Sequence, residues 1–303
     1  MEQRRQGNEA VGLPTISSGG KVQRAVAAAA AVLISFAVMP AHAGAPHRIV
    51  SINLCADELL LALADPDQIA GLSVYATDPD LSFSAAAAAR FPHDAGPAES
   101  VISFSPDLVL AGRYTKLATR EMLGRLGYRV ELLDAASSIA ASEAIIRKVA
   151  VLVGHPDRGE KLVADIEAAK ARAAAAAAAN SAHPTAVVYQ RRGYVTGGDT
   201  LTGELLTVAG FANDGGALAG KYGGFVPLEK IVANPPDYIV VSAAAGHAED
   251  QGSALLQHPA LETLYPPDKR IPLPDKLTAC GGPSLPAAID WLAAEAARPR
   301  QSP

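Results

Sequence analysis

Two cysteines, Cys55 and Cys280, have the most distinctive chemistry in this 303-residue chain, and they lie far apart in it. In an exported protein such a pair favours a structural disulfide, which would close a very long loop and stabilise the fold by several kcal/mol, roughly the upper part of the usual range. Two unpaired thiols, or a thiol presented to a ligand, are the alternatives. A thiol redox protein is a further hypothesis, although no Cys-x-x-Cys pair supports it.

Other residue patterns that carry catalysis are missing. The glycine-rich turn Gly193–Gly198 does not match the spacing of a phosphate-binding loop, and the chain has no nucleophile elbow. No pair of histidines has the spacing of zinc ligands, so a zinc-binding protein is expected only if the scattered histidines converge in space. They are His42, His47, His93, His155, His183, His247 and His258. We therefore predict a protein that is not an enzyme, with no catalytic residue and no metal site of its own.

An internal repeat is the clearest pattern in the sequence. The segment ESVISFSPDLVLAG (Glu99–Gly112) returns as EKIVANPPDYIVVS (Glu229–Ser242). Each copy begins with a glutamate, which suits the positive end of a short helix, and continues through Pro-Asp into an apolar run typical of a buried strand. Two such copies in opposite halves of the chain predict two similar lobes.

The first 43 residues are typical of an export signal. Lys21 and Arg24 precede an apolar segment over 25–38, and Ala41-His42-Ala43 forms an A-x-A cleavage site. We expect cleavage after Ala43 and a periplasmic location for the remainder. That remainder carries a net charge of about −7, which argues against a nucleic-acid partner.

The remaining sequence alternates between predicted strands and helices, which favours parallel sheets covered by helices on both faces. Strands are predicted over 48–51, 69–73, 129–133, 186–189 and 270–273, and helices over 57–64, 116–126, 138–153, 201–209 and 253–264, with an alanine-rich helix ending near 90 and a last helix through 291. A long alanine-rich helix from Asp157 to about Ala179 would be roughly 35 Å long and could join the lobes. A flexible low-complexity linker is the alternative for this segment.

These features resemble the substrate-binding proteins of ABC importers for cobalamin and iron chelates, and the cobalamin-binding members in particular. The segments that carry the resemblance are RIVSINLCADELLLAL (Arg48–Leu63), the two repeat copies and the long helix. The resemblance implies an α/β fold of class III, with two Rossmann-like lobes joined by one long helix and a ligand held between them. The implied boundaries are residues 1–43 for the signal peptide, 44–155 for the first lobe, 156–182 for the bridging helix and 183–303 for the second lobe.

The resemblance also implies a role for the glutamate that begins each repeat copy. Family members dock onto a membrane permease through one glutamate per lobe, and these positions fall on Glu99 and Glu229. A carboxylate on each lobe would fix the orientation of docking. The alternative is that each glutamate is only a favourable charge in the first turn of a helix. A monomer is expected.

Ligand-binding residues are expected in the loops that follow the strands, where open parallel sheets bind their ligands. These loops contain Cys55, Tyr75, His93, Arg113, Tyr114, Tyr194, Tyr222, Leu277, Thr278 and Cys280. Tyrosine and arginine suit a large, flat, partly polar ligand. If the implied fold holds, the two cysteines face each other across the cleft, where a disulfide would set the spacing of the lobes and free thiols could bind a soft metal.

Two departures from the family pattern leave the ligand open. Tryptophans line the cleft of cobalamin binders, whereas Trp291 lies in the last predicted helix. Haem-binding relatives have a tyrosine where this chain has His93, which could ligate the metal of a ligand. The sequence predicts a solute-binding protein for a corrinoid or an iron chelate, with a haem- or metal-ion-binding relative of the same fold as the alternative.

Overall fold

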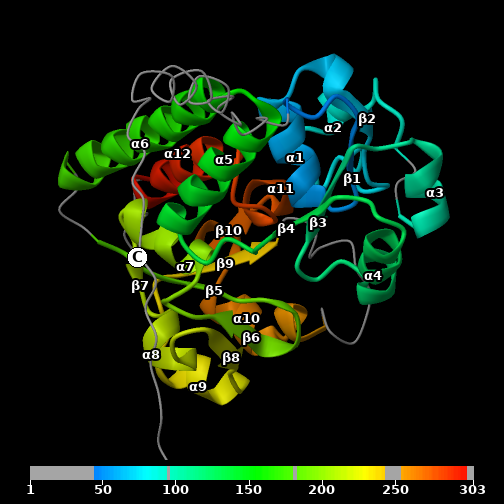
Figure 1. Cartoon of the computed structure of the whole chain (residues 1–303). Helices are drawn as coiled ribbons and strands as arrows, with labels where there is room; N and C mark the ends of the chain where they lie inside the picture. The colour runs from blue at the N-terminus through cyan, green and yellow to red at the C-terminus, as the bar shows by residue number, and fades with distance from the viewer. Residues whose placement is uncertain (1–43, 94–95, 180–182, 243–253, 299–303) are drawn as a thin grey trace, which may run out of the picture. The chain divides into compact units, whose positions relative to one another are not determined.

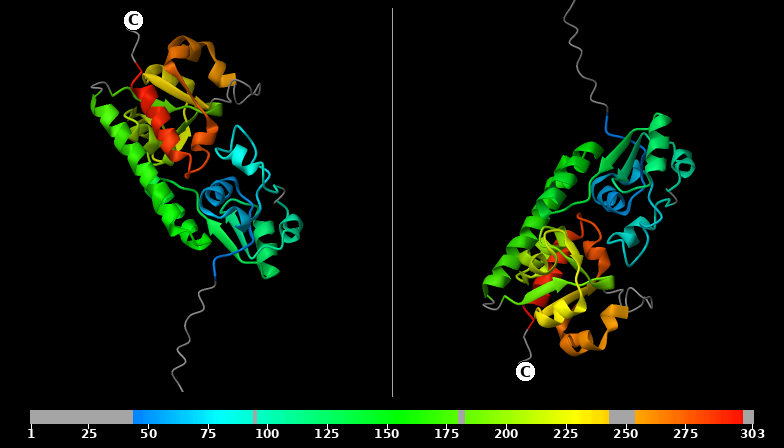
Figure 2. Two further views of the ribbon diagram at one scale, coloured as in Figure 1. Left: turned by 90° about the horizontal axis from the view of Figure 1, so that it is seen from above. Right: turned by 90° about the horizontal axis from the view of Figure 1, so that it is seen from below.

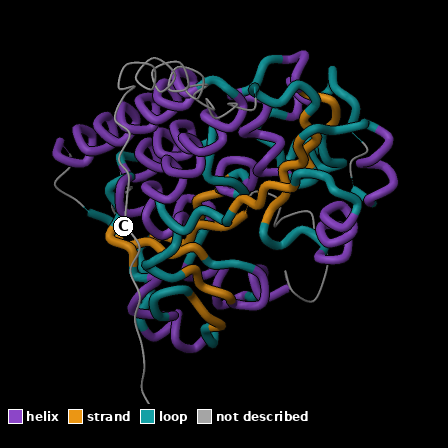
Figure 3. The backbone as a smooth tube through the Cα atoms, in the orientation of Figure 1, coloured by secondary structure: helices purple, strands orange, loops and turns teal. Residues whose placement is uncertain are grey.

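The computed structural model describes residues 44–93, 96–179, 183–242 and 254–298, which fall within one compact unit beginning at Gly44. The predicted signal peptide lies outside the described residues. Two four-stranded parallel sheets organise this unit (Figures 1 and 3). We call each sheet with the helices that cover it a lobe. Within the described residues, no helix combines the length and the hydropathy of a membrane-spanning segment.

The first sheet has the strand order β2-β1-β3-β4. Its strands are β1 (Ile49–Ser51), β2 (Ile69–Gly71), β3 (Leu108–Gly112) and β4 (Val130–Leu133). The central strand β3 is buried along its whole length, as expected for a parallel strand covered on both faces. Because side chains alternate along a strand, Leu108 and Leu110 face one helix layer while Val109 and Ala111 face the other.

Two helix layers cover the first sheet. The helices α1 (Leu54–Leu63) and α5 (Ile139–Val153) share a core with one face, and α3 (Ala98–Ser103) and α4 (Leu117–Arg125) pack on the other. Asn53 caps α1 and Ser138 caps α5 through side-chain oxygens. The alanine-rich helix predicted to end near Arg90 is only the four-residue α2 (Ala85–Ala88), which buries a single alanine and so gains little from packing.

The second sheet repeats the arrangement of the first. Its order is β10-β9-β5-β7, with β5 (Thr185–Val188), β7 (Ala212–Asn213), β9 (Tyr238–Ser242) and β10 (Arg270–Leu273), all parallel. In each sheet, the third strand in chain order lies between the first strand and the fourth. This strand is β3 in the first sheet and β9 in the second. The strands β3 and β9 that follow the two repeat copies are thus equivalent, as the repeat predicts.

The helices of the second lobe also form two layers. Helices α7 (Leu201–Val208) and α12 (Leu285–Ala296) pack on one face of the sheet, and α9 (Leu228–Ala233) and α10 (Pro259–Leu264) pack on the other. Two short helices, α8 (Gly215–Ala219) and α11 (Asp275–Thr278), complete the lobe. The predicted helix over 253–264 was too long, because Pro259 begins α10 and a separate 3₁₀ turn, Ala254–Gln257, precedes it.

A two-stranded antiparallel ribbon was not predicted. It joins β6 (Tyr194–Thr196) to β8 (Gly223–Phe225), so part of the expected glycine-rich turn is a strand. Arg192 and Gly193 both have positive φ, which closes a tight turn between β5 and β6.

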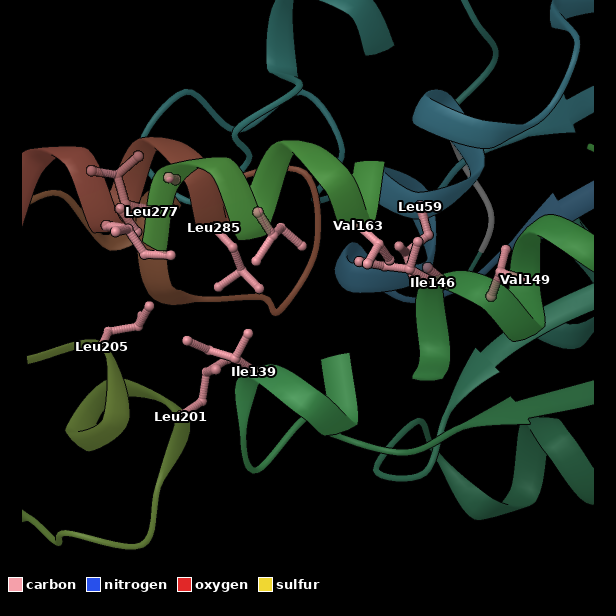
Figure 4. Close-up of a cluster of buried hydrophobic side chains, with 14 of the residues drawn as sticks. Leu59, Ile139, Ile146, Val149, Val163, Leu201, Leu205, Leu277 and Leu285 are labelled. Atoms are coloured by element: carbon pink, nitrogen blue, oxygen red, sulfur yellow. The ribbon is translucent and has the colours of Figure 1, made fainter. Parts of the chain in front are cut away.

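The long helix α6 (Pro156–Ala179) lies beside both lobes (Figure 2). Pro156 is its first residue, where a helix has no carbonyl acceptor for an amide hydrogen. The preceding helix α5 is capped by Gly154, which has a φ of 89°. The buried hydrophobic residues of α6, including Val163, Ile166 and Ala173, belong to a core cluster shared by α1, α5, α7 and α12. Figure 4 shows side chains of both lobes in this cluster. The described segment is therefore a helix and not the alternative flexible linker.

Candidate functional site

A hollow lies where three strands of the second sheet end. It has a volume of about 450 Å³ and borders the carboxyl ends of β5, β9 and β10. A larger hollow of about 750 Å³ runs along the alanine-rich face of α6, away from these strand ends. Open parallel sheets bind ligands beyond the carboxyl ends of their strands, so the smaller hollow is the candidate site. We call it the strand-end cavity.

The strand-end cavity is lined by both apolar and polar side chains. Its lining residues are Val188, Gln190, Arg191, Thr202, Val240, Val241, Ser242, Leu256, Leu273, Asp275, Thr278 and Ala279. The Ser242 hydroxyl donates to Asp275 Oδ2 at 2.7 Å, and Gln190 Nε2 donates to Thr196 Oγ1 at 2.9 Å. These bonds fix two polar side chains in place, which is how an apolar pocket gains orientation-specific contacts.

The first lobe presents exposed aromatic and charged residues after its strands. Tyr75 follows β2 and is 56% exposed, and Tyr114 follows β3 and is 86% exposed. The Arg113 guanidinium pairs with Asp134 after β4 and holds the pKa of that carboxyl below its usual range. Large exposed rings on strand-end loops provide apolar area for a partner or ligand. His93 is exposed, with its Nδ1 3.0 Å from the Phe91 carbonyl oxygen.

The second lobe carries an aromatic group on its ribbon. Tyr194 and Phe225 meet edge to face, with ring centroids 5.5 Å apart, and the Tyr194 hydroxyl donates to the Tyr222 carbonyl at 3.0 Å. Tyr222 is 74% exposed and Phe225 is 69% exposed. Sequence reasoning named both tyrosines but missed Phe225, which follows two glycines in the second strand of the unpredicted ribbon.

Residues 277–280 divide between the core and the cavity. Thr278, which was named as a ligand-binding candidate from its place after β10, lines the strand-end cavity together with Ala279. Leu277 instead packs in the shared core, because it lies on the inner side of α11 (Figure 4). Cys280 is bonded to Cys55 in a disulfide with a Cα–Cα distance of 5.2 Å. Neither cysteine is a free thiol, which removes the basis for a soft-metal thiol site.

Two buried carboxyl groups, Asp57 and Glu58, anchor the loop that carries Tyr75. Asp57 accepts hydrogen bonds from the Ser73 amide at 3.0 Å and from the Ser73 hydroxyl, and Glu58 Oε1 accepts from the Phe83 amide at 2.7 Å. Burial raises the pKa of each carboxyl to about 7, and the charge of Asp57 adds to the rise at Glu58. Both ends of the loop are therefore tied to α1.

Several cavity residues were not predicted. Gln190, Arg191 and Asp275 follow strands of the second sheet, so the rule that named Thr278 would have found them, and Ser242 is the last residue of β9. They were missed because the sequence-based prediction favoured loops with aromatic side chains, which these residues lack. Thr202 lies in α7, and only the packing of that helix places it there. Within the ranges that the structure describes, no three His, Cys, Asp or Glu residues are close enough to hold a metal ion.

Comparison with known proteins places this geometry in context. Residues 49–265 match the model of the periplasmic binding protein family. A cobalamin-binding protein of Halobacterium salinarum is 28% identical over 218 residues, which cover 70% of this chain. The alignment covers 58% of that relative, so the chain spans less than two thirds of the curated relatives it matches.

Solved structures share the fold. A periplasmic haem-binding protein of Roseiflexus sp. RS-1 aligns with a TM-score of 0.66 at 25% identity, covering 82% of this chain and 99% of the other. A periplasmic haem-binding protein of Pseudomonas aeruginosa gives 0.67 at 25% identity, covering 82% and 92%. The vitamin B12-binding protein of Vibrio cholerae, at 16% identity, covers 83% and 96% with a TM-score of 0.59 and supports the fold alone. This chain belongs to the periplasmic binding protein family, which is a family of binding proteins and not of enzymes.

Proposed function

We propose that this protein is the periplasmic solute-binding component of an ABC importer, and that it captures a corrinoid or an iron chelate between its two lobes. The observation that carries the proposal is the strand-end cavity, whose lining residue Ala279 directly precedes Cys280 of the disulfide that links the lobes. It lies where ligands bind in open parallel sheets. The curated relatives with cobalamin in their names support the corrinoid in particular.

The exposed side chains suit a large, flat and partly polar solute. Tyr75 and Tyr114 on one lobe and Tyr222 on the other offer ring faces. Arg191 and Thr278 in the cavity offer donors for amide, carboxylate or phosphate oxygens. Because rings supply apolar area and the polar groups supply orientation, the set suits a macrocycle with polar side groups better than a bare metal ion.

Delivery to the permease would use Glu99 and Glu229. Both carboxylates are exposed and lie on the first turns of α3 and α9, one helix in each lobe. Two rigidly held charges at separate points would select one docking orientation and speed encounter with a basic partner surface.

Haem is the second candidate ligand, because two haem-binding structures align over most of this chain. His93 is exposed and follows Pro92, whose carbonyl accepts a hydrogen bond from the Leu72 amide directly after β2, and an imidazole at this loop could reach a haem iron. A His93→Ala variant separates the candidates. If haemin is added, loss of the absorbance band of the bond between the His93 imidazole and the iron would support haem as the ligand. If cyanocobalamin is added, unchanged binding by the variant would support the corrinoid.

A panel titration tests the function. Purified protein would be titrated with cyanocobalamin, haemin and a ferric siderophore while absorbance and heat are followed. We expect saturable one-to-one binding of one of them, with Thr278→Trp weakening it and Thr263→Trp, an exposed site on α10, leaving it unchanged. Equal weak binding of all three, unaffected by either substitution, would contradict the proposal.

A further inference from the structure

The Cys55–Cys280 disulfide crosses from one lobe to the other. Cys55 is the second residue of α1, which covers the first sheet, and Cys280 lies between α11 and α12, which follow the last strand of the second sheet. The bonded residues are 225 positions apart in sequence. Cys55 is half-buried and Cys280 is only 3% exposed.

The contacts around the disulfide form a close seam between the lobes. A Cβ added at Gly281 would overlap Ser142 Oγ and lie 2.7 Å from Ala136 Cβ, so the turn after Cys280 fits against the start of α5 without spare room. Beside it, Glu204 Oε2 on α7 accepts a hydrogen bond from the Ile139 amide at 2.7 Å. The carboxylate thus satisfies an amide at the positive end of α5.

Two kinds of connection join the lobes, the noncovalent packing of α6 in the shared core and the covalent bond at the seam. A single connecting helix allows two lobes to bend and twist in several directions. A second, covalent connection restricts this motion. The lobes can then rotate mainly about the line that runs through the disulfide and α6. Because Thr278 and Ala279 line the strand-end cavity and directly precede Cys280, this restriction acts at the edge of the candidate ligand site.

We propose that the Cys55–Cys280 disulfide is a redox-removable strap that limits separation of the lobes and so slows the release of bound solute. The inference rests on the proposed function for its effect on solute, while the effect on lobe motion stands apart from any ligand. The oxidised protein is the retaining form, and the reduced protein opens more widely.

Opening the strap requires a dithiol reductant, such as dithiothreitol in the test tube or a dithiol oxidoreductase in the export compartment. One thiolate of the reductant attacks the more accessible Cys55 Sγ, the S–S bond breaks, and Cys280 leaves as a thiolate. The second thiol of the reductant then attacks the mixed disulfide and releases Cys55. The protein gains two electrons and two protons, and the reductant becomes a cyclic disulfide.

The first test measures lobe motion without ligand. The full chain, exported with its leader, would carry spin labels on ketone-bearing residues placed at two exposed positions, Leu126 at the C-cap of α4 and Val232 on α9, which leave the cysteines unmodified. We expect a narrow distance distribution in the oxidised protein. Dithiothreitol, or Cys55→Ser with Cys280→Ser, should broaden it and shift it to longer distances. An unchanged distribution in protein with two titratable thiols would overturn the proposal.

The second test measures solute release. Dissociation of cyanocobalamin, or of haemin if that binds instead, would be followed by stopped flow in the oxidised and reduced protein. We expect release to be about tenfold faster after reduction. The control is oxidised Leu261→Ala, which destabilises the second lobe's own core on the face of the sheet opposite α12 and should not speed release. A broadened distance distribution with an unchanged release rate would overturn the role in retention. If no panel member binds, the proposed function fails while the distance measurement still decides whether the strap limits motion.

Discussion

Glu99 and Glu229 occupy equivalent positions in the two lobes. Each is the second residue of a six-residue helix that begins after a proline cap, and each helix leads to the five-residue central strand of its sheet. The equivalence extends from sequence to topology, because β3 and β9 hold the same place in their sheets. One carboxylate per lobe, held in matching local structure, would suit the docking role proposed above.

Reversing both glutamates to lysine should abolish delivery without affecting solute binding. Each reversal also places a positive charge at a helix N-terminus, at a cost of about 0.3–1 kcal/mol, too little to unfold the protein. Solute titration and uptake through the reconstituted importer would measure the two effects separately. Asp157→Lys is the matched control, since Asp157 lies in the first turn of α6. Full uptake by the double variant would remove the docking role.

Replacing both cysteines by serine should lower the free energy of unfolding. A disulfide that closes so long a loop restricts the unfolded chain, and the entropy model gives a loss of roughly 5 kcal/mol. Urea unfolding monitored by circular dichroism would measure the change. A loss well under 1 kcal/mol would contradict the entropy model and mean that the unfolded chain keeps these two segments close together without the bond.

Adjacent glycines in the turn after Cys280 should respond differently to alanine. Gly281→Ala places a methyl group against Ser142 and Ala136 and should cost about 1–3 kcal/mol through overpacking. Gly282→Ala meets only Leu59 Cδ2 at 3.4 Å, an ordinary contact, and should change stability by less than about 0.5 kcal/mol. Thermal unfolding of the two variants side by side checks the close fit of the seam. Equal stability losses would contradict it.

Stability should fall as pH rises from about 5 to 7. Asp57 and Glu58 have pKa values raised to about 7 in the folded protein, so the folded state holds protons that the unfolded state releases near pH 4. Their contribution is therefore complete below pH 4 and is lost as pH rises through 7. Asp65 and Asp134 have lowered pKa values, so their contribution to the free energy of unfolding is lost only as pH falls into the acid range below this window.

Glu58→Gln tests this pH dependence. Glutamine keeps an acceptor for the Phe83 amide and cannot ionise. The loss of unfolding free energy between pH 5 and pH 7 should therefore be smaller than in the unaltered protein by about 1–3 kcal/mol. Glu121→Gln on the exposed face of α4 is the control and should leave the slope unchanged. A Glu58→Gln slope equal to that of the unaltered protein would show that Glu58 titrates normally.

The repeat, the β-α alternation and the alanine-rich helix were readable from the sequence because each is a local signal. The buried run in β3 marks a parallel strand, and Pro156 with the following acidic residue marks the start of α6. The β6–β8 ribbon was missed because its strands are three residues each and rich in glycine. The sequence left the state of Cys55 open, since only the packing of α1 against the turn at Cys280 brings the sulfurs together. Thr202 could not be predicted for the same reason.

Titration of two tryptophan variants tests the central claim most directly, with whichever solute binds in the panel. Ala279 lines the strand-end cavity and Ala174 lines the larger hollow beside α6, and both are exposed alanines. Ala279→Trp should fill the cavity and lower affinity at least about tenfold, the equivalent of 1.4 kcal/mol, while Ala174→Trp should bind as the unaltered protein does. Weakened binding in Ala174→Trp with full affinity in Ala279→Trp would contradict the claim that solute binds in the strand-end cavity of the second sheet.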